Sequence, residues 1–360
     1  MKKLILLLIG AVMVCAVQAQ MVEEGEAALV YYAPKTAVAL DFTYTVETQV
    51  RGQFAQFAES LLGATDVVTE NSSSYTLDEV RISTSTSADQ SRPHKITVDG
   101  GIPMLFTIND KGLLTGYNIS PESQADRRVR HESSTRPAVK SRISPKRIAP
   151  YPEEVLKAGG PASQARETAK QILHIRETRM YLLSGEVERA PADGKAMELV
   201  LEELDRQEEA LTELFIGKRT KKTEHKKVTL NSIHRNGSQD REIYKEYLYF
   251  SGENGFTSKE NVDADSILVW IGCHKAHYKA SEIDAKKSKK RGDEASQVIY
   301  NLPGDAVVRV IYQGRLLGER TIPVAQKGID VPLPKNLFTG SELPKIVFSE
   351  KTGNVISISK

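Results

Sequence analysis

Apolar and polar side chains alternate over long stretches towards both ends of this chain, whereas its middle follows the spacing of helices. The clearest alternating run covers residues 37–50 and is rich in Val, Phe, Tyr and Thr. A period of two places every second side chain on one face of a strand. Further runs of this kind lie at 74–84, at 95–98 and between 223 and 358. The chain is therefore predicted to be an α+β protein, mainly β, with antiparallel sheets.

Residues 162–217 are predicted to form a long antiparallel helical hairpin. Ile172 and Leu183 lie on an apolar stripe of the first helix, and Leu211 and Phe215 lie on a stripe of the second. Three further apolar residues widen the second stripe: Leu199, Val200 and Leu201. This surface exceeds what pairing of the two helices requires. We expect it to be covered by a neighbouring sheet or by a partner protein.

The chain divides into a signal peptide (1–19), an N-terminal β domain (20–120), a basic, proline-containing linker (121–161), the hairpin (162–217) and a C-terminal β domain (218–360). The stretch from Pro121 to Arg147 holds eight basic and three acidic residues and few large apolar ones. Such a composition predicts disorder, because little burial offsets the chain entropy. The expected architecture is two antiparallel β domains connected by this linker and by the helical hairpin.

The N-terminus has the pattern of a cleavable secretory signal. Met1-Lys2-Lys3 is followed by an apolar run that ends at Val17-Gln18-Ala19, which predicts cleavage after Ala19. The run is too short for a comfortable membrane span, and no later stretch is longer. We therefore expect an exported protein without a transmembrane span, in the periplasm or associated with the outer membrane. Lipid attachment at Cys15 is the alternative.

Charge and cysteine content narrow the possible partners and cofactors. The formal net charge is only +2, which argues against nucleic acid as a partner. After signal removal Cys273 is the one remaining cysteine, so no internal disulfide is expected. No cofactor is predicted.

Cys273, His274 and His277 are the weak candidates for metal ligands. Zinc requires three or four such ligands in a tetrahedral array, and no second cluster supplies the fourth. Alternation from Ile267 also places Cys273 on the core face of a strand. The sequence contains no Gly-x-Ser-x-Gly elbow, His-Glu-x-x-His motif or phosphate-binding loop. No catalytic residue is predicted, although a dispersed triad is recognised only by its geometry.

Three further patterns have a functional and a structural interpretation. Glu186 and Glu188 are either an acid pair of the kind used in glycoside hydrolysis or ordinary residues of a solvated loop. Aromatic residues near one another in predicted strands suggest either a sugar platform or core packing: Tyr247, Tyr249, Phe250 and Trp270. The tripeptide Asp265-Ser266-Ile267 fits a short O-glycosylation pattern or an ordinary turn before a strand.

Several segments, in this order, resemble the domain-of-unknown-function 4831 family. They are YYAPKT (31–36), FAQFAESLLG (54–63), IRETRMYLLSGE (175–186), AMELVLEELDRQEEALTELFIGK (196–218), NLPGDAVVRVIYQGRLL (301–317), PVAQKGIDVPLP (323–334) and KIVFSEKTGNVISI (345–358). The resemblance implies an exported envelope protein of Gram-negative gut and oral bacteria. It implies no activity and no catalytic residue.

The leading hypothesis is a non-catalytic envelope protein, a binding or assembly module whose partner is an envelope polymer or an envelope protein. One alternative is a periplasmic or surface hydrolase that acts on glycan or peptide, which requires titratable groups converging in a cleft. Another alternative is a carbohydrate-binding module, which requires exposed, coplanar aromatic rings.

Overall fold

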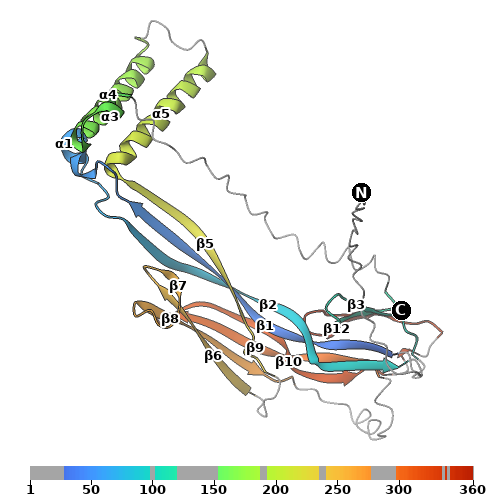
Figure 1. The fold of residues 1–360 in the computed structure, drawn as a ribbon. Helices are drawn as coiled ribbons and strands as arrows, with labels where there is room; N and C mark the ends of the chain where they lie inside the picture. Colours follow the sequence, from blue (N-terminus) through green and yellow to red (C-terminus); the bar gives the residue numbers. More distant parts are fainter. Residues whose placement is uncertain are drawn as a thin grey trace, which may run out of the picture.

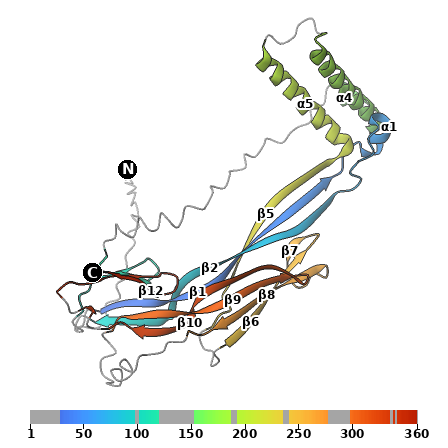
Figure 2. The same ribbon diagram turned by 180° about the vertical axis from the view of Figure 1, so that it is seen from behind.

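The structure is a computed structural model in which an elongated arm connects a β-sheet body to a helical head (Figures 1 and 2). The described residues are 28–97, 102–119, 153–186, 193–234, 241–276, 297–334, 337–338 and 341–359. The predicted signal peptide lies outside them, as does most of the predicted linker. In this part of the chain, no helix is both long and apolar enough to cross a membrane.

The predicted fold class is confirmed, because antiparallel strands dominate and helices are few. One sheet has the strand order β2-β1-β5, formed by Ser72–Thr97, Ala28–Val50 and Lys218–Leu230. The second sheet has the order β10-β9-β8-β6-β7, formed by Arg315–Pro332, Ile299–Tyr312, Ala264–His274, Arg241–Ser251 and Gly255–Thr257. The third has the order β12-β11-β4-β3, formed by Val355–Ser359, Lys345–Phe348, Leu114–Tyr117 and Phe106–Ile108.

The body buries its main core between the first two sheets. Alternate residues of β1, including Leu40 and Phe42, point towards alternate residues of β8 and β9, including Val269 and Val308. These four side chains are almost completely buried. The period-two pattern of the sequence therefore corresponds to a two-sheet core.

The structure corrects how the two predicted β domains are joined. Strand β5, from the predicted C-terminal β domain, pairs with β1 of the predicted N-terminal β domain. Strand β11 of the former likewise pairs with β4 of the latter. A second core beneath the third sheet also combines these two domains, since Tyr31 and Tyr117 pack with Phe338 and Phe348. Among the described residues, the predicted C-terminal β domain covers strand edges and apolar faces of the predicted N-terminal one. The two predicted domains consequently share sheets and cores.

Strands β1, β2 and β5 continue beyond the body as the arm (Figure 1). β1 has 23 residues and is about 75 Å long at roughly 3.3 Å per residue. Its pairing with β5 runs from Val38↔Leu230 to Val50↔Lys218 without a register shift. Most of β5 is exposed and basic, and lysines on an edge strand oppose pairing with other chains.

The predicted helical hairpin is present at the end of the arm. Helices α4 (Pro161–Ser184) and α5 (Gly194–Ile216) pack at their base on a 3₁₀ turn, η1 (Ala55–Phe57), and on α1 (Ala58–Leu62). The Asp193 side chain caps α5 by accepting a hydrogen bond from the Ala196 amide at 2.7 Å. Together these helices form the head.

The last part of the predicted linker is corrected. Residues Glu153–Lys157 form a short helix, α3, next to α4. Val155 is buried there, and acidic residues at the start with a lysine at the end complement the helix dipole. A proline at the first position of α4 favours helix initiation. Residues 153–161 are therefore structured, contrary to the prediction.

Two glycines allow backbone segments to approach closely. Gly217, between α5 and β5, has φ +81°, and a Cβ there would lie 2.6 Å from the Val50 carbonyl oxygen. A Cβ on Gly304 would lie 2.4 Å from the carbonyl oxygen of His274. A Pro-Gly-Asp sequence such as that at 303–305 is typical of a turn, but β9 continues through it. Its glycine serves close packing rather than a turn.

Candidate functional site

The two metal candidates that the structure describes, Cys273 and His274, do not converge. Cys273 is buried in the main core, as the alternation predicted, and burial raises the pKa of its thiol to about 11. The next residue on β8, His274, is exposed on the opposite face, and His277 lies outside the described residues. Among the residues that the structure describes, no cluster of three or more His, Cys, Asp or Glu side chains is arranged for a metal.

The predicted aromatic group is split between two faces of the second sheet. Phe250 is buried in the core, whereas Tyr247 and Trp270 lie on the outer face. The guanidinium of Arg309 lies over the Trp270 ring at 5.3 Å, and the ring edge contacts the Gly272 backbone. The indole is therefore already packed, and Tyr247 is the more exposed ring of this face.

Those of the remaining sequence candidates that the structure describes do not line the cavity found in the body. Glu186 is exposed just after α4, and Glu188 falls outside the described residues. Ser266 is exposed near the start of β8, and the neighbouring Asp265 carboxylate accepts a hydrogen bond from the Gln313 side chain at 2.6 Å. Glycosylation of this serine stays a prediction.

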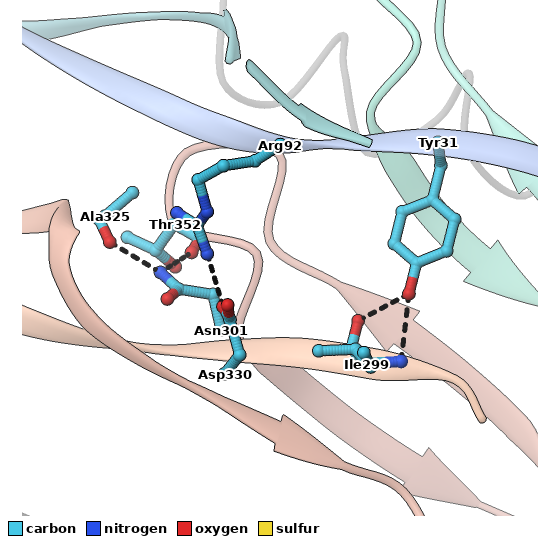
Figure 3. Close-up of polar contacts among 7 residues, drawn as sticks. All are labelled: Tyr31, Arg92, Ile299, Asn301, Ala325, Asp330 and Thr352. Atoms are coloured by element: carbon cyan, nitrogen blue, oxygen red, sulfur yellow. Dashed lines mark hydrogen bonds and ion pairs between the residues drawn. The ribbon is translucent and has the colours of Figure 1, made fainter. Parts of the chain in front are cut away.

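A polar cluster in the body connects strands of the first two sheets to each other and to the turn before β12 (Figure 3). The Tyr31 hydroxyl donates to the Ile299 carbonyl at 2.8 Å and accepts from the Ile299 amide at 2.9 Å. Asn301 donates to the carbonyls of Ala325 and Thr352 at 3.1 and 2.8 Å. These contacts connect β1 to β9, and β9 to β10 and to the turn before β12.

The same region contains a narrow cavity next to Tyr31, His94 and Asn301. Burial raises the pKa of the Tyr31 hydroxyl and lowers the pKa of the His94 imidazole, whose ring centroid is 5.2 Å from that of Tyr31. The space inside the cavity is about 20 Å³, which is room for about one water molecule. This cluster holds the sheets together and does not form a substrate pocket.

A second polar cluster surrounds Lys327, whose side chain is 1% exposed. Its ammonium donates to the Glu242 carboxylate at 2.6 Å and to the Tyr244 hydroxyl at 3.0 Å. Burial alone would raise the pKa of Glu242, but the hydrogen bonds from Lys327 and Tyr244 outweigh it and lower that pKa. Lys327 lies where the ladder between β9 and β10 shifts register. No sequence pattern indicates this pair, because alternation does not reveal such irregularities.

The head differs from the body because its apolar stripe is covered over only part of its length. At the base of the hairpin, Ala165 and Ile172 of α4 pack against Leu211 and Phe215 of α5. Phe215 also contacts Phe54, with the ring centroids 5.4 Å apart. These residues form a small closed core beside α1.

Ion pairs cross between the two helices above this core. Glu208 of α5 accepts from Arg176 at 2.6 Å and from Arg179 at 2.5 Å. Arg179 also pairs with Asp205 at 2.6 Å. Glu208 is largely covered, with 17% of its side chain exposed, so these pairs hold the helices together at mid-length.

Beyond the ion pairs, the stripe of each helix is open to solvent. Leu183 lies 11 residues after Ile172, which places both on one face of α4, yet Leu183 is 67% exposed. On α5, Val200 precedes Leu211 by the same spacing and is also exposed. A shallow hollow on this part of α5 has Met197 and Leu201 with acidic neighbours at its edge: Glu198, Glu202 and Asp205.

We call this part of the hairpin the tip. It is defined by Met180, Leu183 and Val200, which are exposed, and by Met197 and Leu201, which are half-buried. The sequence predicted that a sheet or a partner would cover the surplus apolar surface of α5. Cover by a sheet is wrong for the described residues, because the arm holds the head away from the sheets of the body (Figure 2). The tip is therefore the candidate functional site.

Fold and candidate site together define a mainly antiparallel β protein that presents a partly open helical hairpin at the end of a β arm. The chain belongs to the family described as Domain of unknown function (DUF4831), whose model matches residues 27–356. Comparison with curated proteins gave no match, and neither did comparison with solved structures. The match extends over body, arm and head.

Proposed function

We propose that this protein is an exported, non-catalytic binding or assembly module of the cell envelope, and that the tip of its head contacts a partner protein. One observation carries the proposal: an apolar stripe that is core at the base of the hairpin continues as exposed surface at the tip. Exposed apolar surface of this kind is typical of interaction sites. The arm supports the same function, since it displays the head far from the body.

The export half of the proposal is supported by the N-terminal sequence alone, through the basic start and the apolar run before Ala19. N-terminal sequencing of the protein isolated from the bacterium is expected to begin at Gln20. A lipid-bearing N-terminus at Cys15 would instead attach the protein to a membrane and contradict this part.

The two alternatives have weaker support among the described residues. A hydrolase requires a cleft with converging titratable groups, and the cavity beside Tyr31 has room for about one water molecule. A carbohydrate-binding module requires free ring faces, and Arg309 already lies over the Trp270 ring. The exposed stripe favours a protein partner over both.

The proposal is tested by photo-crosslinking in living cells. A photoreactive phenylalanine derivative replaces Leu183, which lies on the stripe. The matched control replaces Tyr181, which is also exposed on α4 but points about 160° away, since successive residues are about 100° apart.

We expect one reproducible cross-linked product from the Leu183 position and none from the Tyr181 position, with an exported protein identified in the product by mass spectrometry. Absence of any product at Leu183, or the same products at both positions, would contradict a binding role for the tip.

A further inference from the structure

We propose that the occupant of the tip is a cationic amphipathic helix of the partner protein; this rests on the proposed function and specifies its ligand. The hollow on α5 supplies an apolar floor, Met197 and Leu201, with carboxylates beside it. An amphipathic helix that lies in an apolar groove is a recurring mode of recognition. The charge around the hollow then determines which helices bind there.

Two of the three carboxylates beside the hollow can pair with a positive charge on an incoming helix. Glu198 and Glu202 are exposed, and neither forms an ion pair with another described residue. Asp205 pairs with Arg179 and thus marks where the closed part of the hairpin ends. An incoming helix with lysine or arginine beside its apolar face would place cations near two unpaired carboxylates.

The whole of α5 has the charge that such a partner would complement. It holds seven acidic and two basic residues, a net charge of −5, whereas α4 holds two acidic and four basic residues, a net charge of +2. The basic residues of α4 nearest the tip, Arg176 and Arg179, are already paired with α5. The hairpin thus uses its own cations at mid-length, and beyond them residues 194–202 of α5 hold two glutamates against one lysine, Lys195.

The hollow lies on α5 alone, but the tip also presents apolar side chains of α4 to an additional helix. Leu183 and Met180 of α4 are exposed on the stripe side of that helix, and Met197 and Leu201 belong to the stripe of α5. In the closed part of the hairpin these stripes pack on each other. At the tip a third helix can contact both stripes and extend the small core of the head outward.

The experiment measures binding of synthetic peptides to the purified chain by fluorescence anisotropy at low salt. The first peptide is a Leu/Lys sequence of about 18 residues with its leucines on one helical face, which gives about five turns. The second has the same composition in scrambled order. The third keeps the pattern of the first with Glu in place of Lys.

We expect the patterned Leu/Lys peptide to bind at least about tenfold more tightly than either control peptide. Leu201→Asp is expected to weaken its binding by about tenfold or more, and Glu198→Lys with Glu202→Lys by about fivefold. Leu199→Asp is the matched control, because Leu199 is 59% exposed and points about 160° away from Leu201. It is expected to change binding by less than about twofold.

Equal binding of the scrambled peptide would mean that charge alone attracts it, and equal binding of the Leu/Glu peptide would remove the role of the carboxylates. Equal losses in Leu199→Asp and Leu201→Asp would place binding elsewhere. Self-association of the chain that Leu201→Asp abolishes would identify a second copy as the occupant. Each of these results overturns the inference. A cross-linked partner at Leu183 without peptide binding would leave the proposed function standing and reject only the cationic helix.

Discussion

The body and the head of this protein bury their apolar side chains to different extents. In the body, β1 and its neighbours face a second sheet, so that Phe42 and Val308 are fully covered. In the head, the apolar stripe of α4 is covered at Ile172 and exposed at Leu183. The main core of the body is closed between two sheets, whereas the stripe of the head has apolar surface that nothing among the described residues covers. This difference is the reason to place binding at the tip.

The largest effect is expected where one strand passes from the body into the arm. Phe42→Ala leaves a cavity between the two sheets and should lower the free energy of unfolding by about 3–5 kcal/mol. Val50→Ala, on the exposed end of the same strand, should change it by less than about 0.5 kcal/mol. Denaturant unfolding of both variants measures the difference. Similar losses would mean that the arm is packed as tightly as the body.

The buried ion pair provides the next test of the body. Glu242→Ala leaves the Lys327 ammonium without its anionic partner and should cost about 3 kcal/mol of unfolding free energy. Replacing both residues, Glu242→Leu with Lys327→Met, should regain most of that loss, because no buried charge remains. A single variant as stable as the wild type would show that Lys327 reaches solvent.

The same pair predicts a dependence on pH. Because the folded state lowers the pKa of Glu242, its contribution to stability is fully present above the ordinary glutamate pKa, about 4.3. That contribution is lost as the pH falls through the lower folded-state pKa. The stability advantage of the wild type over Glu242→Gln should be constant at neutral pH and shrink in acid. An advantage that grows in acid would contradict the assigned direction.

The smallest effect is expected at Cys273. Its thiol is buried, and its pKa is raised to about 11, so little thiolate is present at pH 8. A thiol reagent should label the folded chain far more slowly than the unfolded chain, and added zinc should leave the melting temperature unchanged. Rapid labelling of the folded chain, or a zinc-dependent rise of several degrees, would revive the metal hypothesis for Cys273 and His274.

Local patterns predicted much of the fold, because they are set by neighbours in the chain. Alternation at 37–50 identified part of β1, and helical spacing with Gly217 identified the end of α5. Alternation shows which face of a strand is buried but not which strand lies beside it. The pairing of β1 with β5 and of β4 with β11 therefore could not be predicted, and local patterns alone indicate two separate β domains.

The candidate site was predicted only in part. The surplus apolar surface of α5 was evident from Leu199, Val200 and Leu201, but whether a sheet covers it depends on where the arm holds the head. Leu199 also turned out to lie off the stripe. The burial of Lys327 had no local signal either, since it arises from a register shift between β9 and β10.

The most direct test of the account compares two substitutions on one stripe of α4, Ile172→Asp at the base and Leu183→Asp at the tip. Loss of helical circular dichroism in denaturant reports unfolding of the head. An unpaired charge in the closed core should cost about 3 kcal/mol or more. The same charge at the tip should cost less than about 0.5 kcal/mol, because that side chain is already in solvent. Equal losses at the two positions would show that the tip is closed and that no binding surface exists there.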